Sequence, residues 1–454
     1  MCKEKNFCYI NPSFSAQYNF SGMANFHENF LQLVWKYQYF NKTQLATTQN
    51  LPLVVKKIGF HNFYEGPDFS EAHIRLAQLD HYGHVEIHLR SSDWHNHAHS
   101  ADTRYDSVIL HVVWDHDQDI YRSDGTVIPT LELKGKVYLD VLRNFERLIS
   151  GNSDILCSDD LGRVEDIIKF SMLEKTLVER FVEKSKLVNE ILATTKGDWE
   201  ETTYRWLFYN FGFKANNAVM LKLATSLPYR ILKRHTGQPL IQEALLMGQA
   251  GFLNAAVEDD YGRFLYREYD FFRNKYKIKS SVYPSEWKFM RVRPTNYPSV
   301  RLAQLAAILH HSPNLFSAIL DSVKDHHAFR NQFSFQISSY WQHHYQLGKQ
   351  TARKQNRALS AEMLDLLAIN FMVPLWYAYG QYMDDTSWQE RCFDLLQEIS
   401  AEKNHITQRF EFRQWTAHSA YDSQGMIGLY NNYCTKKRCL ECKVGQNLLR
   451  PQKV

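Results

Sequence analysis

Half of the 20 histidines in this 454-residue chain fall between His61 and His116. The same stretch holds nine carboxylates and only three residues of the Lys and Arg type. Imidazole and carboxylate are the side chains that bind divalent metals and transfer protons near neutral pH. A packed core does not need that density of polar, titratable groups. The sequence therefore places the candidate chemical site in this stretch.

Three of these residues are spaced as metal ligands on two neighbouring extended runs. Glu86 and His88 are two residues apart in HVEIHLR, so in a strand they point to the same side. Asp68 directly follows the Gly66-Pro67 pair and stands shortly before the extended run at residues 72–79. Two such carboxylates can hold Mg²⁺ or Mn²⁺ while a third group aligns or deprotonates water. The metal would neutralise the phosphodiester charge that otherwise repels the attacking oxygen.

This arrangement resembles the motif of the PD-(D/E)xK nuclease superfamily. Pro67-Asp68 matches the PD, and Glu86-Ile87-His88 matches (D/E)xK with histidine in the place of lysine. The resemblance implies metal-dependent cleavage of nucleic acid, supported by a glutamate on the preceding helix, here Glu28. The departure at His88 matters, because a neutral imidazole ligates metal or acts as a base, whereas lysine is a charged donor. An ordinary polar strand face is the alternative interpretation.

A second group of candidate ligands follows in SSDWHNHAHSADTRYD, residues 91–106. His97 and His99 form an H-x-H pair, a frequent metal-ligand spacing, and Asp102 follows closely. We expect these residues to form a second-rank metal set, with a second ion as one option. A solvated loop whose Asp and Ser cap a helix is the alternative. The H-x-H pair also resembles a cupin metal site, which would require an antiparallel jelly roll and a distal histidine such as His111.

Three of the seven cysteines stand close together near the C-terminus, as Cys434-x4-Cys439-x2-Cys442. Zn²⁺ takes four tetrahedral ligands, and a CxxC pair with a third thiol upstream suits such a site. The fourth ligand is not local, and the candidates are His418, Cys392 and Cys157. The pattern also resembles the iron–sulfur loop of some DNA-repair glycosylases, but no cysteine follows Cys442. Three reduced structural thiols are the remaining interpretation.

Basic strips in the second half of the chain predict nucleic-acid contacts. Positive side chains bind phosphates, and neighbouring aromatic rings stack on bases. The predicted contact residues are Arg291, Arg293, Arg301, Lys349, Arg353 and Lys354. A solvated helix face is the alternative for each strip taken alone.

The first third of the chain must position the candidate site. Residues 25–45 have the apolar spacing of an amphipathic helix. Extended runs follow at residues 51–60, 72–79, 84–90, 107–114 and 126–138, with turns predicted at Gly and Pro, including Gly83. From about Arg163 the apolar period is helical. We predict an α+β protein, with a mixed α/β sheet domain of restriction-endonuclease-like outline at residues 1–155 and a mainly α-helical domain at residues 156–454.

Composition indicates a well-packed globular protein. Hydrophobic residues make up 44% of the chain, and the net charge of +4 gives no global argument for nucleic acid or membrane. The N-terminus lacks the apolar stretch of a secretory signal. The most apolar segment, residues 363–380, carries Asp365, Asn370 and Pro374, which favours a buried helix pair over a membrane span. We expect a cytoplasmic location, reduced thiols and no membrane partner.

Motifs spread over almost the full length resemble one uncharacterised bacterial family, domain-of-unknown-function family 2851. The central motifs are GPDFSEAHI, VEIHLRSSDWHNHAH and VILHVVWDHD. Others are EALLMGQAGFL, RPTNYPSVRLAQLA and YCTKKRCLECKVG. The resemblance implies that these motifs belong together, and it implies no activity.

Taken together, these patterns predict a metal-dependent, nuclease-like protein that acts on DNA or RNA. Asp68 and Glu86 would hold Mg²⁺ or Mn²⁺, His88 would ligate it or act as a base, and the helical region would bind the substrate. A non-catalytic nucleic-acid or protein-binding scaffold and a cupin-like metalloenzyme are the alternatives. A mixed sheet flanked by the Glu28 helix would favour the nuclease, as would Asp68 and Glu86 carboxylates close enough to share one cation.

Overall fold

The computed structural model describes residues 27–151, 153–254, 259–279, 282–322 and 325–451. The chain forms two compact units. The first comprises the described parts of Met1–Met172 with Phe412–Trp415 and Leu429–Val454, and the second comprises those of Leu173–Glu411 with Thr416–Gly428. The first contains a mixed sheet and the second is almost all helix, so the predicted α+β class is confirmed. This division differs from a single domain boundary after residue 155, because the cysteine-bearing C-terminal segment belongs to the first unit.

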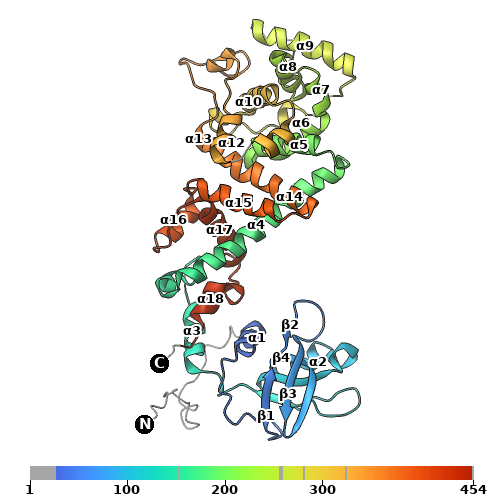
Figure 1. Ribbon diagram of the computed structural model, residues 1–454, viewed down its shortest axis with the longest axis vertical. Helices are drawn as coiled ribbons and strands as arrows, with labels where there is room; N and C mark the ends of the chain where they lie inside the picture. Colours follow the sequence, from blue (N-terminus) through green and yellow to red (C-terminus); the bar gives the residue numbers. More distant parts are fainter. Residues whose placement is uncertain (1–26, 152, 255–258, 280–281, 323–324, 452–454) are drawn as a thin grey trace. The chain divides into compact units, whose positions relative to one another are not determined.

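A mixed β-sheet forms the centre of the first unit (Figure 1). Its strands in the described residues are β1 (Leu53–Lys57), β2 (Phe60–His61), β3 (Phe69–Leu76), β4 (Leu79–Arg90), β5 (Val108–Asp115) and β6 (Thr130–Glu132). Their order is β1-β3-β4-β5-β6, with β2 paired to β3. The β1, β3 and β4 pairings are antiparallel, whereas β4, β5 and β6 run parallel. The segment between β4 and β5 is therefore a crossover connection.

The turn predicted at Gly83 is wrong. Leu76 pairs with Leu79, so β3 and β4 are joined by a two-residue hairpin turn that contains Ala77 with a φ of 52°. Gly83 lies inside β4 and pairs with Ala72. A side chain there would overlap the carbonyl oxygen of Ser107, just before β5. Glycine is thus needed at this point for close approach of two backbones, and not for a turn.

Helix α1 (Glu28–Tyr37) covers one face of the sheet and packs against β4. It is shorter than the predicted helix at residues 25–45, because Gln38 adopts a left-handed conformation that ends it. Its buried side chains include Phe30 and Val34, which share one core with Val85 and other inward residues of β4 and β5. Helix α3 (Leu139–Ile149) contributes to the same core. Val85 and Ile87, on the face of β4 that carries neither Glu86 nor His88, are buried in this core.

The opposite face of β4 is covered by the β4–β5 crossover. This segment contains the short helices α2 (Asp93–Asn96), η2 (His99–Ala101) and η3 (Thr103–Tyr105). Trp94 and Tyr105 from this segment form a small apolar cluster with Val108, Ile120 and Ile128. As a result Glu86 and His88, on this face, are only 5% and 1% exposed. The candidate site therefore lies beneath the crossover and within the unit.

The second unit is a helical array (Figure 1). Its helices are α4 (Asp166–Thr194), which begins in the first unit, and then α5 (Trp199–Phe211), α6 (Phe213–Ser226), α7 (Tyr229–Lys233), α8 (Pro239–Gln249), α9 (Asp260–Tyr276), α10 (Pro298–His311), α11 (Leu315–Ser317), α12 (His326–Gln332), α13 (Ala361–Leu367), α14 (Val373–Met383), α15 (Ser387–Glu398), α16 (His405–Glu411) and α17 (Ala420–Leu429). A two-stranded hairpin, β7 (His344–Gln346) and β8 (Lys349–Gln350), is inserted between α12 and α13.

The predicted apolar segment forms one long helix, with α13 and α14 joined by the π-helical turn η9 (Ala368–Met372). Among the described residues, Ala361–Met383 is long and apolar enough to cross a membrane by length and composition alone. Of its most apolar window, 72% is buried within the protein. Its polar groups have protein partners: Asp365 accepts from Arg330, and Asn370 accepts from Lys184. These features are typical of a core helix.

Candidate metal centre

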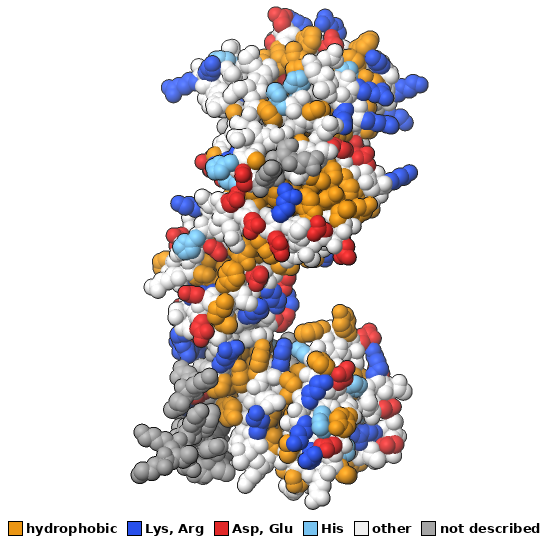
Figure 2. Space-filling model, viewed as in Figure 1, with side chains coloured by type: hydrophobic (Ala, Val, Ile, Leu, Met, Phe, Trp, Pro, Cys, Tyr) orange, Lys and Arg blue, Asp and Glu red, His pale blue; other side chains and the backbone are white. Residues whose placement is uncertain are grey.

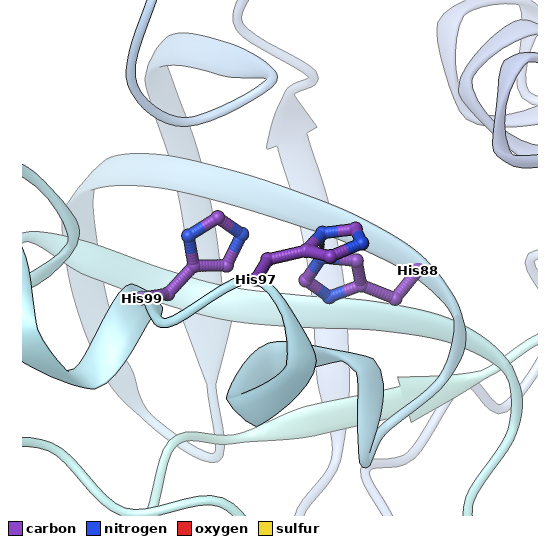
Figure 3. Close-up of side chains that lie close together, drawn as sticks. All are labelled: His88, His97 and His99. Carbon is purple, nitrogen blue, oxygen red and sulfur yellow. Dashed lines mark hydrogen bonds between the residues drawn. The ribbon is translucent and has the colours of Figure 1, made fainter.

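The polar face of β4 gathers imidazoles from three segments. Glu86 pairs in parallel register with His111 of β5, so the two side chains lie on the same face of the sheet. His88 is two residues further along β4. The crossover brings His97 and His99 over this face, and the ligand nitrogens of His88, His97 and His99 lie within 4.8 Å of one another (Figure 3). The two histidine groups that the sequence suggested separately thus form one cluster.

Short contacts connect the imidazoles to each other and to Glu86. His88 Nδ1 lies 2.9 Å from His111 Nε2, and His88 Nε2 lies 3.2 Å from His97 Nδ1. Glu86 Oε1 lies 3.5 Å from His88 Nε2 and 3.3 Å from His99 Nε2. Burial, together with the neighbouring imidazoles, lowers the pKa of His88 to about 2 and that of His111 to about 3. Both rings are therefore neutral at pH 7, as metal ligands must be.

Two buried carboxyl groups lie beside the imidazoles. The backbone N–H of Asp68 donates to Glu86 Oε2 at 3.0 Å, and the backbone N–H of Ile87 donates to Asp68 Oδ2 at 3.1 Å. Burial and repulsion from Glu86 together raise the pKa of Asp68 to about 7. Burial, together with repulsion from Glu28, raises the pKa of Glu86 to about 8. Two carboxyl groups held this closely need either protons or a cation to offset their repulsion.

The donor set fits a divalent cation. His99 Nε2 is buried without a hydrogen-bond partner among the described residues, although it lies 3.3 Å from Glu86 Oε1. A buried imidazole nitrogen that lacks a hydrogen-bond partner and lies close to a carboxylate oxygen is placed so that both atoms could ligate one ion. Imidazoles mixed with carboxylates suit Mn²⁺ or Zn²⁺ better than Mg²⁺, which prefers oxygen ligands and keeps its waters. Of the two predicted ions, Mn²⁺ is therefore the better match.

Aromatic side chains pack against His88, His99 and His111, whereas His97 is exposed. The ring of Tyr105 stacks on His99 with ring centroids 3.8 Å apart. Trp94 meets the edges of His88, His99 and His111 at centroid distances of 5.3–6.4 Å. These contacts restrict ring rotation and keep water away, so electrostatic interactions inside the cluster are stronger than in solvent. Burial raises the pKa of Tyr105 to about 12, and its hydroxyl stays protonated.

The other predicted residues of this stretch divide into two groups. Glu28, half-buried in the first turn of α1, belongs to the cluster electrostatically: burial raises its pKa, and His97 and His99 oppose that shift. Asp102 instead forms an ion pair with Arg104, in which Oδ2 and Nη2 are 2.6 Å apart. Its side chain also caps η3 by accepting a hydrogen bond from the Arg104 backbone N–H. The loop-capping alternative therefore describes Asp102, whereas His97 and His99 join the site.

One contributor was missed from the sequence. Gln32 donates from its Nε2 to Asp68 Oδ1 at 2.8 Å. It lies one helical turn after Glu28, so both project from the same side of α1. That spacing was the available signal, because a helix that supplies Glu28 to the site also presents residue 32 to it.

A surface pocket of about 360 Å³ lies next to the Asp68 turn. Its lining includes Gly66, Pro67, His84, Thr103 and Arg104. The Arg104 guanidinium is half exposed and is shared between Asp102 and Glu65. The pocket therefore presents a positive group at the rim of an otherwise acidic and imidazole-rich region.

The predicted nucleic-acid contacts belong to the second unit. Arg301 is only 5% exposed, stacks on Phe213 and donates to Gln304 at 2.7 Å, so it supports the packing of α10 and is not presented to a phosphate. The other five predicted residues are exposed: Arg291, Arg293, Lys349, Arg353 and Lys354. Figure 2 shows Lys and Arg side chains spread over the surface of the helical unit and mixed with Asp and Glu.

The family comparison covers most of the chain. Residues 28–405 match a family model described as "Protein of unknown function (DUF2851)". No curated protein and no solved structure matches the chain. The matched range contains all the histidines and carboxylates of the cluster and stops short of the three C-terminal cysteines.

Proposed function

The chain belongs to the DUF2851 family, described as proteins of unknown function, and we propose that it is a metal-dependent phosphodiesterase that cleaves nucleic acid. The observation that carries this proposal is the buried pair of Asp68 and Glu86 beside the His88, His97 and His99 cluster. Perturbed carboxyl groups next to neutral imidazoles are typical of catalytic metal sites, and a core has no structural need for them.

The environment of each residue suggests a different role in the proposed site. Glu86, His97 and His99 would hold the cation, with His88 and Asp68 completing the set. His88 is a poor general base at neutral pH, because burial holds its pKa near 2. Glu28 is the better candidate for a base, since it is only half-buried and burial raises its pKa.

A bound divalent cation would supply positive charge for the phosphate oxygens and lower the pKa of a water molecule. In the proposed reaction the water oxygen would attack phosphorus while Glu28 accepts a proton of the water. The P–O ester bond would break with its electron pair on the leaving oxygen, which would then take a proton from solvent water. Asp68 and Gln32 keep Glu86 in place through the hydrogen bonds described above. Trp94 and Tyr105 would shield His88, His99 and His111 from solvent.

The sheet supports the nuclease over the cupin-like alternative. An antiparallel β3–β4 hairpin carries Asp68 and Glu86, and β5 follows in parallel after the crossover. Helix α1, which carries Glu28, lies on this sheet. A cupin requires an antiparallel sandwich, and the parallel β4–β5–β6 pairing does not match one. The exposed Arg and Lys residues of the second unit would contact phosphates of a DNA or RNA substrate.

Cleavage assays test this proposal. The full-length protein is incubated with Mn²⁺ or Mg²⁺ and a panel of single- and double-stranded DNA and RNA, and products are resolved on gels. We expect cleavage with Mn²⁺ that Glu86→Gln abolishes, because glutamine keeps the shape and removes the charge that holds the ion. His95→Ala, which changes an exposed histidine of the same crossover, is the control and should keep activity. A protein that binds Mn²⁺ and cleaves nothing on the panel would instead support the scaffold alternative.

A further inference from the structure

The C-terminal cysteines pack against a segment that precedes them by more than two hundred residues. Cys442 directly precedes α18 (Lys443–Leu448), and Cys157 directly precedes η4 (Ser158–Arg163). Helix α18 packs against η4, so the two cysteine-bearing ends meet within the first unit. The remaining two cysteines flank the same tail: η10 (Tyr430–Cys434) ends at Cys434, and η11 (Cys439–Glu441), which packs against it, begins at Cys439.

A cavity and a shared core join the same segments. The cavity, of about 380 Å³, is lined by Gly151, Ser153, Asp154 and Leu156 from one segment and by Tyr430 and Cys434 from the other. Cys157 and Cys439 both pack against the core formed by α1 and the sheet. Gly445 of α18 has no space for a side chain, because a Cβ there would overlap the carbonyl oxygen of Cys439. Close packing therefore fixes the tail against the Cys157 segment.

We propose that Cys157, Cys434, Cys439 and Cys442 together bind one thiolate-coordinated metal centre, with Zn²⁺ as its expected occupant. This site is separate from the histidine cluster and does not depend on the proposed phosphodiesterase activity. Of the three fourth ligands that the sequence left open, the packing selects Cys157. The centre would link the C-terminal tail to residues 151–163. Both segments belong to the first unit, although residues 173–411 of the second unit lie between them in the sequence.

The other two candidates for the fourth ligand lie elsewhere. Cys392 and His418 belong to the second unit, whereas Cys157 and the three tail cysteines belong to the first. Cys392 is buried on α15, and its thiol donates to the Val373 carbonyl.

Four thiolates favour soft metals. A tetrahedral sulfur set selects Zn²⁺ or an iron–sulfur cluster over Mg²⁺ and Mn²⁺. Binding would deprotonate thiols that burial otherwise keeps protonated. Lys437, two residues before Cys439 in the sequence, would lie near the resulting negative charge.

Metal analysis of the full-length protein, purified without added metal, tests the proposal. We expect about one zinc per chain, and X-ray absorption at the zinc edge should show four sulfur neighbours at about 2.3 Å. Cys157→Ser should lose the metal, whereas Cys392→Ser, a matched change at a buried cysteine outside the cluster, should retain it. The absorption measurement uses the unmodified protein, so it remains decisive where Cys157→Ser fails to fold.

The outcomes separate the alternatives. Iron and acid-labile sulfide with visible absorbance, lost on Cys157→Ser, would support the four-thiolate site and identify a cluster as its occupant. Three sulfur neighbours and one nitrogen would overturn the assignment of Cys157. Protein that is well folded, free of zinc and iron, and unable to take up added Zn²⁺ would overturn the site itself.

Discussion

The backbone N–H of Asp68 donates to the carboxyl group of Glu86 at 3.0 Å. In the other direction, the N–H next to Glu86, that of Ile87, donates to the carboxyl group of Asp68 at 3.1 Å. These reciprocal bonds connect the start of β3 to the middle of β4 and hold two acidic side chains together in a buried place. The sheet pairing itself thus creates an acidic pair that requires a proton or a cation.

The first prediction concerns cation binding by the crossover histidines. His99→Ala removes a nitrogen that faces Glu86 Oε1 at 3.3 Å. We expect the affinity for Mn²⁺ to fall by at least about 100-fold, because loss of a direct ligand exceeds the 10–100-fold effect typical of supporting residues. Isothermal titration calorimetry measures the change. His95→Ala should bind as the unmodified protein does, and equal isotherms for all three proteins would refute a site at His99.

The second prediction concerns stability and pH in the metal-free protein. The pKa values of Asp68 and Glu86 are raised from 3.8 and 4.5 to about 7 and about 8. The folded protein therefore binds these protons more tightly than the unfolded chain does. Their stabilising contribution is complete below about pH 4 and is lost as the pH rises through 7 and 8. The lowered pKa values of His88 and His111 act in the opposite direction below about pH 6.5, because the unfolded chain binds protons there that the folded protein does not. Above that pH the loss of the carboxyl protons dominates, and we expect the unfolding free energy to fall between about pH 6.5 and 8.5 by an amount on the order of a few kcal/mol.

Urea unfolding between about pH 6.5 and 8.5 measures this loss. Glu86→Gln should flatten the profile and make the metal-free protein more stable than the unmodified one at pH 8, because it removes the buried negative charge. Mn²⁺ should restore stability to the unmodified protein at pH 8, since a ligand that binds only the folded state stabilises it. A profile of the unmodified protein that rises between about pH 6.5 and 8.5 would contradict the raised pKa values.

Local sequence patterns were sufficient for much of the candidate site. Strand alternation predicted that Glu86 and His88 share a face, and the H-x-H spacing singled out His97 and His99. Both inferences use rules that act over a few residues. The same reasoning misplaced Gly83, because glycine in a turn and glycine under a neighbouring strand look alike until the partner strand is known.

Contacts between segments that lie far apart in the sequence could not be predicted from such local patterns. The convergence of His97 on His88 depends on how the crossover folds back over β4, and nothing in the loop sequence specifies that path. The assignment of residues 429–454 to the first unit depends on packing against η4, across an interval that includes the whole second unit. The sequence therefore offered three candidates for the fourth ligand of the cysteines and no basis for choosing among them.

The third prediction concerns His111, which supports the site from behind His88. Its Nε2 lies 2.9 Å from His88 Nδ1, so the hydrogen bond fixes the orientation of the His88 ring and leaves His88 Nε2 toward the cluster. His111→Phe keeps a ring of similar shape and removes this bond. We expect Mn²⁺ affinity to fall 10–100-fold, the usual effect of losing such a supporting residue.

Two further measurements distinguish positioning from a general structural role. His111 Nδ1 is buried without a partner among the described residues, so the metal-free His111→Phe protein should be at least as stable as the unmodified one. His111→Gln, which can still hydrogen-bond to His88, should recover part of the affinity. Unchanged Mn²⁺ binding by His111→Phe would show that His88 needs no support from β5.

The fourth prediction concerns Gly83, where β4 and β5 approach most closely. A Cβ atom at this position would overlap the Ser107 carbonyl oxygen and lie 2.6 Å from Ile109 Cγ2. The pairing of β4 with β5 also shifts register between His84 and Val85, directly beside Glu86. Gly83→Ala should therefore lower the unfolding free energy by about 1–3 kcal/mol, as overpacking usually does.

Because this steric overlap lies close to Glu86, we expect Gly83→Ala to have a second effect. Glu86 on β4 and His111 on β5 are neighbours only through the pairing that Gly83 permits, so forcing the strands apart should also weaken Mn²⁺ binding. Gly162→Ala is the control, because a Cβ there meets no atom of the described residues within 4 Å. Urea unfolding and calorimetry on both variants check the two effects. A Gly83→Ala protein that loses stability but binds Mn²⁺ unchanged would show that the site tolerates movement of β5, and would count against His111 as the residue that positions His88.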